Sequence, residues 1–341
     1  MNVEQAENPE RWNRFVEEQS GPIFSRWEWS EICASYGHDI QNLVAKNDGE
    51  IVGVLPLVEV NSSLFGHKLV SMPFCEYGGP ITRESDHNVA EQLGEKVHQI
   101  ANRNEVDFVS LRNTVADIAD RYEAKERFVN FQLTLDDIDE VWDGFESRLR
   151  RGIRKAEDEN IEIQICSSED DLRQFYDLFL ETMRGHGSPP HSFAFFKEIW
   201  TSFDTDQFRV FLAFYEGKLV NGIAVFKWAD KALYWSGASD IEYRDLNGGS
   251  LALWEAIQWA HDMGCLKFDL GRTREGSGVY MYKKGFGGEK IWMQDYHYLT
   301  EGAELPNPED DKYELPMKVW KRLPMKLTEI LGPPIRKNIT L

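Results

Sequence analysis

The sequence predicts an α+β protein made of two tandem copies of one unit, with mixed, mostly antiparallel sheets. The passages LVAKNDGEIVGVLPLVEV (residues 43–60) and FLAFYEGKLVNGIAVFKW (residues 211–228) share a plan of apolar run, acidic-Gly dipeptide and apolar run, which is typical of a β-hairpin. Each is followed by a helical pattern and a short apolar run that ends in arginine, Arg112 in the first copy and Arg272 in the second. Two matching pairs in the same order, both offset by roughly 160 residues, indicate a duplication.

Length and composition agree with two globular domains. The chain has 341 residues, 42% of them hydrophobic and 13% aromatic, as in folded rather than disordered proteins. No apolar run is long enough for a membrane helix and the start MNVEQAENPERWNRF is polar, so we expect a cytoplasmic protein. A formal net charge of -20 repels polyanions and argues against DNA as a partner.

The repeat sets the expected boundaries: a first unit over residues 1–145, a second over residues 146–300, and a basic tail over residues 301–341 that packs back on the body. Each unit should read helix, helix, hairpin, strand, helix, strand, which gives an α+β layer. Ser167 or Ser168, with an acidic residue three positions later, is typical of a capping box at a helix start.

The segment between the two copies, VWDGFESRLRRGIRKAEDENIEIQI, carries the one dense group of cations in this acidic sequence. A helix over Arg148–Lys155 places Arg151 on one side and Arg154 beside it. We take Arg151 and Arg154 as candidate substrate-binding residues. A solvated helix face is the alternative.

A second group of cations lies in the stretch KFDLGRTREGSGVYMYKKGFGG, residues 267–288. In a loop, Arg272, Lys283 and Lys284 form either solvated surface charge or an anion site. Read as an extended segment, VYMYKK places Lys283 on the opposite side from Tyr280 and Lys284.

Cysteine and histidine spacing predicts no metal centre. The eight histidines form no H-E-x-x-H or similar cluster, and no C-x-x-C pair occurs. We expect unpaired, mostly buried thiols in a reducing compartment, at Cys33, Cys75, Cys166 and Cys265.

Eight stretches along nearly the whole chain carry a resemblance to a known family. In chain order they are FSRWEW, GVLPL, SMPFCEYGGP, RRGIRKAEDENIEI, HGSPPHSFAFF, LALWEAIQWAHDMGCLKFDLGRT, GSGVYMYKKGFGG and WKRLPMKLTEILGPPI. The chain resembles the Fem-type aminoacyltransferases, especially the FemAB-like proteins linked to envelope polysaccharide genes. The most specific part is the series Asp269, Gly271, Arg272, Ser277, Gly278, Tyr280, Lys283, Phe286 and Gly287.

This resemblance implies two acetyltransferase-like (GNAT) domains and amide formation on a cell-envelope precursor. Fem-type enzymes move an amino acid from its tRNA ester to an amine of a murein precursor, and other members are thought to use acyl-CoA. We therefore expect an N-acyltransferase that takes aminoacyl-tRNA and an envelope or lipid-linked acceptor, without a bound cofactor. The alternatives are an acyl-CoA-dependent N-acetyltransferase acting on an amino sugar or peptide in polysaccharide biosynthesis, and a non-catalytic binding scaffold.

The acyl-CoA alternative depends on one helix start. Acetyltransferases hold the CoA pyrophosphate with R/Q-x-x-G-x-G/A, where backbone N–H groups and the helix dipole favour anions. Here the matching stretch reads RDLNGGSLALW, with Arg244, then Asn247 in place of the first glycine, and Gly249. Asn247 weakens the match, although asparagine tolerates positive φ better than most residues. Arg244 and Asn247 are candidate substrate-binding residues.

Acyl transfer to an amine needs a neutral amine, a positioned ester or thioester, and a stabilised oxyanion. The sequence has no G-x-S-x-G elbow and no recognisable Cys–His pair, so direct attack in a ternary complex is the simpler scheme. Lys283 is the candidate for the oxyanion or the tRNA-end phosphate, where a preorganised cation contributes roughly 3 to 4 kcal/mol. Glu76 and Asp269 are candidate proton acceptors, with a turn position and an ion pair to Arg272 as their respective structural alternatives.

Arg272, Tyr280 and Lys284 complete the expected substrate-binding set, because the planar guanidinium of arginine suits phosphate and carboxylate. We expect Arg272 and Lys283 to line one cleft with the helix Arg148–Lys155. As a loop charge, Lys283 should be exposed, and its loss should change stability by no more than about 0.5 kcal/mol.

The C-terminal segment is basic and amphipathic. Residues 312–341 contain seven Lys or Arg and two acidic residues, with apolar residues between them near helical spacing. This pattern predicts either a helix on an anionic membrane surface or one that packs on its own domain. Peripheral contact with the inner face of the membrane is therefore an expectation.

Overall fold

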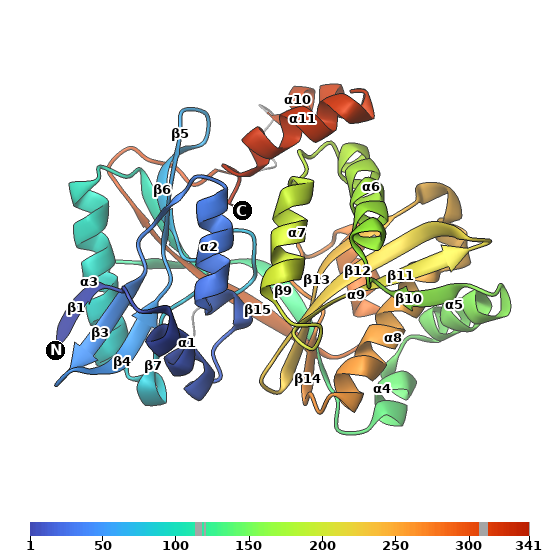
Figure 1. Cartoon of the computed structure of the whole chain (residues 1–341), viewed down its shortest axis with the longest axis horizontal. Helices are drawn as coiled ribbons and strands as arrows, with labels where there is room; N and C mark the ends of the chain where they lie inside the picture. The colour runs from blue at the N-terminus through green and yellow to red at the C-terminus, as the bar shows by residue number, and fades with distance from the viewer. Residues whose placement is uncertain (113–117, 119–120, 307–312, 341) are drawn as a thin grey trace. The chain divides into compact units, whose positions relative to one another are not determined.

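The structure is a computed structural model that describes residues 1–112, 118, 121–306 and 313–340 (Figure 1). It divides into two compact units, and both are discontinuous in sequence. Unit 1 comprises Met1–Arg127, Trp292–Pro308 and Lys337–Leu341, and unit 2 comprises Phe128–Ile291 and Glu309–Arg336.

These bounds differ from the predicted boundaries at residues 145 and 300. Most of strand β9 (Glu123–Thr134) lies in unit 2, because it pairs with β14 (Lys267–Asp269). Most of strand β15 (Glu289–Leu299) lies in unit 1, because it pairs with β8 (Phe108–Leu111). Both partners are distant in sequence, so no local pattern marks these boundaries.

Unit 1 has two groups of strands. One runs β1-β3-β4-β7 and the other β15-β8-β6-β5-β2, in which only β6 and β8 are parallel. Helix α3 covers the sheet through a buried apolar face that includes Leu93 and Val97. The further elements are α1 (Pro9–Glu18), α2 (Trp27–Ser35), α3 (His87–Arg103), β1 (Asn2–Gln5), β2 (Asp39–Ile40), β3 (Leu43–Asn47), β4 (Glu50–Leu55), β5 (Val58–Ser62), β6 (Gly66–Val70) and β7 (Ile81–Thr82).

Unit 2 is a sheet in the order β10-β11-β12-β13-β14-β9 with helices on both faces. Its ladders are antiparallel except for the parallel pair β13–β14. Helix α8 packs with Phe211 on one face, and Phe175 of α6 packs against Gly222 on the other. The elements are β10 (Glu162–Ile165), β11 (Phe208–Tyr215), β12 (Lys218–Trp228), β13 (Lys231–Ser239), α4 (Ile138–Gly144), α5 (Ser147–Asp158), α6 (Glu169–His186), α7 (Phe193–Ser202), α8 (Gly248–Asp262), α9 (Gly278–Lys284), α10 (Glu314–Trp320) and α11 (Met325–Arg336).

The predicted capping box at the start of unit 2 is present. Ser168 is the N-cap of α6, its side chain accepts from the backbone of Asp171, and the Asp171 side chain accepts in return from the N-cap backbone.

The two hairpins confirm the duplication. Each turn has two residues with positive φ: Asp48 (50°) and Gly49 (85°) in the first, Glu216 (49°) and Gly217 (77°) in the second. This is the geometry of a type I′ turn, which matches the twist of the flanking strands.

The irregularities of the two ladders are equivalent as well. The register shifts after Ala45 in β3 and after Ala213 in β11, each three residues before its turn. In both cases one valine of the second strand, Val52 or Val220, has no partner in the ladder. A shared bulge at a shared position is typical of a duplicated unit.

The four cysteines are free and buried, as predicted. Over the described part of the chain, no three His, Cys, Asp or Glu side chains gather in a group that could hold a metal ion. Among the described helices, none combines the length and apolar character needed to cross a membrane.

Candidate active site

The turn that follows β14 is the centre of the candidate site in unit 2. The strand ends at the buried Asp269, and Gly271 takes φ 74°, a left-handed conformation that glycine adopts without strain. Beyond it, Thr273 pairs with Val129 of β9 through two backbone hydrogen bonds of 2.8 and 2.9 Å. Strand β9 therefore holds the turn in place.

The segment after this turn is a helix, so the extended reading of VYMYKK is wrong. Ser277 caps α9 by accepting a 3.0 Å hydrogen bond from the N–H of Tyr280. In this helix Lys283 points inward, whereas Val279 and Met281, which the extended reading placed beside it, are exposed. The local cap outweighs the alternation of side chains in so short a segment.

Lys283 is enclosed rather than exposed, which corrects the expectation of a loop charge. Its side chain is 5% exposed, and Nζ donates to the carbonyls of Gly271 at 3.0 Å and Arg272 at 3.1 Å. The ammonium also lies 5.5 Å from the centroid of the Tyr234 ring. A cation is thus fixed at the end of β14, in a buried environment where its charge acts strongly.

Asp269 fixes the turn. Its Oδ1 accepts a 2.6 Å hydrogen bond from the N–H of Gly271, and its Oδ2 accepts a 2.7 Å bond from Nδ2 of Asn130. Both carboxylate oxygens are therefore engaged in holding the backbone that Lys283 contacts. This geometry favours a positioning role for Asp269 over that of a proton acceptor.

The other predicted residues of this stretch lie around the turn. Arg272 is half-buried, with its guanidinium 4.7 Å from the centroid of the Phe128 ring. Tyr280 packs against Phe131 at 5.3 Å, and Lys284 is exposed. A guanidinium stacked on an aromatic ring keeps its planar fork oriented for phosphate or carboxylate.

The start of α8 lies next to α9. The hydroxyl of Tyr282 donates to the carbonyl of Gly249 at 3.2 Å, and burial raises the pKa of Tyr282, so its hydroxyl stays protonated. Asn247 takes φ 59°, as its tolerance of positive φ allows, and its carbonyl accepts from the N–H groups of Ser250 and Leu251. The first backbone N–H groups of a helix have no intrahelical acceptor, which suits them to bind an anion.

Helix α5 borders the start of α8. A side chain at Gly152 would lie 2.9 Å from Oδ1 of Asn247, and Lys155 donates to the carbonyl of Asp245 at 2.9 Å. Arg154 is exposed, with its guanidinium 5.5 Å from the centroid of the Trp142 ring. The structure thus brings α5, Asn247 and α9 into one region of unit 2.

Arg151 and Arg244 are both exposed. A cleft that joins Arg151 to Lys283 and Arg272 stays a prediction.

Glu76 lies in unit 1, in the loop that follows β6. The loop contains two buried non-glycine residues with positive φ, Met72 at 47° and Phe74 at 68°. Cys75 accepts a 3.1 Å hydrogen bond at its carbonyl from Arg112. Backbone strain of this kind persists where the surrounding structure enforces it, often at functional sites. The role of Glu76 as a proton acceptor stays a prediction.

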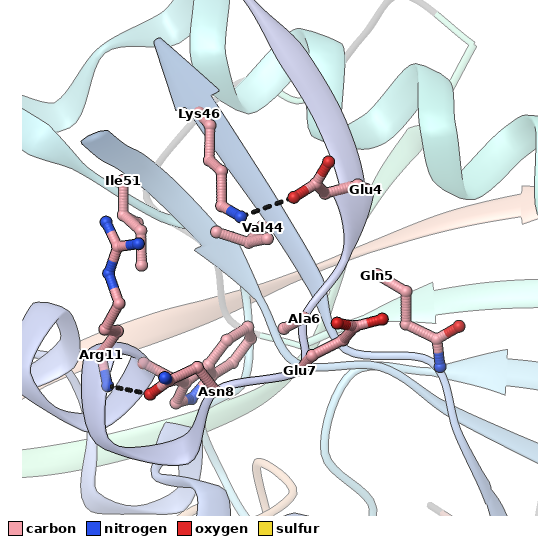
Figure 2. A pocket seen from close by; sticks show the side chains of 10 residues that line it. Glu4, Gln5, Ala6, Glu7, Asn8, Arg11, Val44, Lys46 and Ile51 are labelled. Atoms are coloured by element: carbon pink, nitrogen blue, oxygen red, sulfur yellow. Dashed lines mark hydrogen bonds and ion pairs between the residues drawn. The ribbon is translucent and has the colours of Figure 1, made fainter. Parts of the chain in front are cut away.

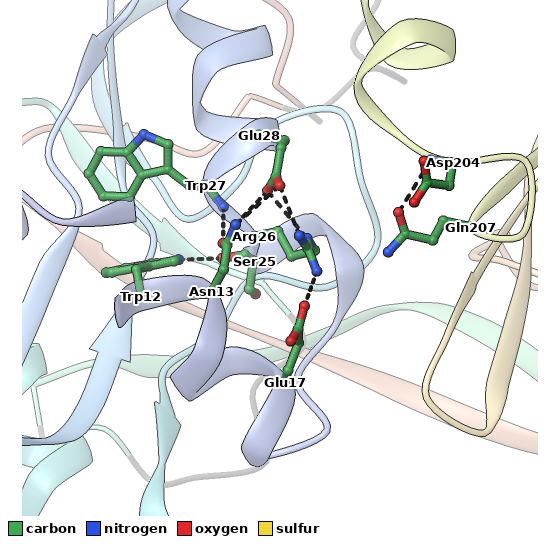
Figure 3. Close-up of polar contacts among 9 residues, drawn as sticks. All are labelled: Trp12, Asn13, Glu17, Ser25, Arg26, Trp27, Glu28, Asp204 and Gln207. Carbon is green, nitrogen blue, oxygen red and sulfur yellow. Dashed lines mark hydrogen bonds and ion pairs between the residues drawn. The ribbon is translucent and has the colours of Figure 1, made fainter. Parts of the chain in front are cut away.

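The FSRWEW stretch forms a network in unit 1 that is structural (Figure 3). Glu28 accepts hydrogen bonds from Asn13 and Arg26, and the N–H of Trp27 donates to Asn13 at 2.8 Å. Burial alone would raise the pKa of Glu28, but the contacts with Arg26 and Asn13 lower it below its ordinary value. These bonds fix α1 to the start of α2.

A pocket lies beside the start of α1 in unit 1 (Figure 2). It is bordered by Asn8 and Arg11 of the α1 start and by Lys46, which pairs with Glu4 at 2.5 Å. Its volume of about 140 Å³ is below the roughly 300 Å³ of ordinary small-molecule sites, so it is no candidate for a nucleotide.

Three residues of the site were missed by sequence reasoning: Asn130, Tyr234 and Tyr282. Asn130 sits in β9, which the predicted boundary assigned to the other unit, and is a polar side chain 2% exposed. The signal available in the sequence was a polar residue, Asn130, between the apolar Val129 and Phe131. Burial raises the pKa of Tyr234 to about 12, so this phenol is also neutral beside Lys283.

Comparison with protein families identifies the second unit. Residues 144–284 match the model of the acetyltransferase (GNAT) domain. The curated UDP-N-acetylmuramoylpentapeptide-lysine N(6)-alanyltransferase of Weissella viridescens is 24% identical over 170 residues, which is 49% of each chain. The chain therefore spans about half the length of this relative.

Solved structures extend the similarity to both units. FemX aligns with a TM-score of 0.68 and 15% identity, over 88% of this chain and 98% of that chain. L-PGS from Bacillus licheniformis aligns with a TM-score of 0.56 and 13% identity, over 97% and 98% of the two chains. A tandem GNAT protein from the clavulanic acid biosynthesis pathway aligns with a TM-score of 0.53 and 11% identity, over 89% and 100%. These comparisons confirm the predicted fold of tandem GNAT-like domains and the resemblance to Fem-type proteins.

Proposed function

We propose that this chain is an N-acyltransferase of the Fem type, which transfers an aminoacyl group from aminoacyl-tRNA to an amine of a cell-envelope or lipid-linked precursor. The observation that carries the proposal is the buried ammonium of Lys283, held by two carbonyls at the end of β14 within the GNAT segment. The name of the W. viridescens relative, an alanyltransferase that acts on a lysine amine, supports the same reaction class.

In the proposed reaction, the amine nitrogen attacks the carbonyl carbon of the aminoacyl ester. A C–N amide bond forms, the C–O bond to the tRNA ribose breaks, and the proton lost by the amine ends on the ribose hydroxyl. Negative charge develops on the carbonyl oxygen between these events. Lys283 stabilises this charge, because its ammonium is already oriented and partly desolvated before the reaction.

The remaining residues bind and position the reactants. Asp269 and Asn130 hold the turn, and Arg272 and Tyr280 border it. Arg151, Arg154 and Lys284 are proposed to contact phosphates of the donor. Glu76 is the proposed proton acceptor. The scheme needs no bound cofactor.

An acyl-CoA donor is the second candidate, and one observation favours it. At the start of α8, Asn247 adopts a left-handed conformation, φ 59°, which a glycine at this position of the motif would adopt without strain. The backbone conformation is therefore compatible with the motif despite the substitution, and a helix start can bind an anion. Arg244 would then contribute to CoA binding.

Donor competition tests the two candidates. The purified chain is incubated with a charged tRNA pool or with acetyl-CoA and an extract of envelope precursors, and new amides are detected by mass spectrometry. The proposal predicts products with charged tRNA, lost in Lys283→Met and retained in Lys96→Met, which removes a cation of α3 in unit 1. Products with acetyl-CoA alone would favour the second candidate. No product with either donor would favour a non-catalytic scaffold.

The proposal also sets the place of the reaction. Charged tRNA is a cytoplasmic donor, and a lipid-linked acceptor lies at the inner face of the membrane, so the chain is proposed to act there as a peripheral protein.

A further inference from the structure

Helix α11 is fixed on unit 2 by one side, and α10 lies near the end of α6, where a side chain at Gly187 would lie 2.9 Å from the carbonyl oxygen of Met317. Arg173 of α6 pairs with Glu329 at 2.8 Å, and a side chain at Gly332 would lie 2.3 Å from Pro190. Nε of Arg336 donates to Nε2 of the buried His191 at 3.1 Å. The exposed apolar residues of α11 therefore lie on a helix that is held on unit 2.

The exposed surface of the two helices is unusually apolar. Of the fourteen large hydrophobic side chains that are exposed in the described residues, six lie within residues 315–331. They are Leu315 (70% exposed), Met317 (39%), Val319 (53%), Leu327 (42%), Ile330 (58%) and Leu331 (46%). Exposed apolar side chains gathered in one short segment indicate a surface that meets a partner or a membrane.

Cations surround these apolar groups in an otherwise acidic chain. Four exposed cations, Lys318, Lys321, Arg322 and Lys326, alternate with them. The two acidic residues of the helices are paired, Glu314 with Lys318 and Glu329 with Arg173. Against a net charge of -20, this is a local positive surface.

We propose that this C-terminal face, the six apolar residues and four cations named above, docks unit 2 on an anionic lipid surface. The apolar side chains enter the boundary between headgroups and acyl chains, and the cations contact lipid phosphates. Helix α11 packs on its own domain through its opposite side.

Charge complementarity favours lipid over a second copy of the chain. In a symmetric dimer the same patch meets itself, so two surfaces of like, positive charge would be brought together. An anionic headgroup layer instead neutralises them. The reason for docking rests on the proposed function, because a lipid-linked acceptor is reached from the membrane surface. Lipid binding itself does not depend on it.

Vesicle flotation without substrates tests the proposal on the full chain. Binding is expected to vesicles of phosphatidylcholine with phosphatidylglycerol, to be weak on phosphatidylcholine alone, and to fall as salt rises. The double variant Lys321→Glu, Lys326→Glu should lose at least ~fivefold in affinity per charge. Leu327→Ser with Ile330→Ser should also reduce binding at unchanged unfolding midpoint.

Two matched controls separate the face from general effects. Ile241→Ser with Leu266→Ser removes two apolar side chains that are 71% and 50% exposed elsewhere in unit 2. Lys96→Glu with Arg103→Glu makes the same charge change on α3. Both should bind vesicles like the unaltered chain. Because flotation is measured without substrates and amide formation is measured in the donor competition, failure of docking and failure of the proposed function are distinguishable.

Equal loss in the controls, or binding unaffected by the variants of the C-terminal face, would overturn the proposal. So would dimerisation in sedimentation experiments that depends on Leu327 and Ile330 without vesicle binding, because the face would then be an interface between copies.

Discussion

Lys283 is a cation enclosed by the turn that it holds, and this changes the expected effect of its loss. Lys283→Met leaves the carbonyls of Gly271 and Arg272 without these donors in a buried site, which costs on the order of 1–3 kcal/mol. Lys284→Met at the exposed neighbour should change stability by no more than about 0.5 kcal/mol. Urea unfolding of both variants measures the difference. Equal stability of the two would contradict the enclosed site.

A buried histidine makes the stability of unit 1 depend on pH. Burial is the main cause that lowers the pKa of His297 to about 4, with Asp295 opposing and Arg127 contributing in the same direction. The unfolded chain binds this proton near pH 6.5, so between about pH 6.5 and 4 the unfolded state carries more protons. The free energy of unfolding should therefore fall by about 3 kcal/mol as pH drops across this window from this group alone.

His297→Gln should flatten that part of the pH profile of unfolding. A profile for His297→Gln that is parallel to that of the unaltered chain would show that His297 does not titrate as stated.

Residue types in the site could be read from the sequence, but their surroundings could not. Arg272, Lys283 and Asp269 were predicted because they stand in one short motif. The hydrogen bond that holds Asp269 comes from Asn130 of β9, which lies 139 residues earlier in the chain. No local pattern contains that contact.

At the scale of elements, turn chemistry was the most reliable signal. Asp-Gly and Glu-Gly between apolar runs predicted both hairpins, because glycine supplies positive φ at no steric cost. The segment 278–284 was misread, because seven residues are too few to separate helical from alternating patterns. In this segment the N-cap hydrogen bond at Ser277 favours the helix over the strand.

The two hairpin glycines should be equivalent in energy. Gly49→Ala and Gly217→Ala each force a side chain into positive φ, which costs roughly 1–2 kcal/mol. A Cβ at either position has nothing within 4 Å, so the cost is that of the backbone alone. Gly144→Ala is the control, because it has space and no positive φ. Thermal unfolding measures the stability of the three variants. If one hairpin variant were as stable as Gly144→Ala, the shared turn geometry would be contradicted.

At the scale of the whole molecule, the sequence predicted the duplication but not the boundaries between the two units. The repeat offset divided the chain near residue 145, whereas β9 contributes to unit 2 and β15 to unit 1. The unit to which each strand belongs is set by a pairing partner distant in sequence. The periodicity of apolar residues within a strand does not predict that partner.

Fragments test the corrected boundary. Residues 146–300 lack the β9 strand, and with it the pairing of Asp269 with Gln132 and the bond from Asn130. We expect this fragment to unfold without a sharp transition, because an edge of its sheet and a buried carboxylate lose their partners. Residues 128–291 retain both and should unfold cooperatively. Circular dichroism during urea titration distinguishes them. A cooperative transition in fragment 146–300 would instead support the boundary predicted from the repeat.

The most direct test of the account is mass spectrometry of envelope-precursor extracts from a deletion strain and its parent. The account predicts a species in the parent that is heavier by one aminoacyl group on an amine, absent in the deletion strain. It predicts restoration by the unaltered chain and by Lys96→Met, but not by Lys283→Met at equal protein level. Identical extracts from the two strains, or full restoration by Lys283→Met, would contradict it.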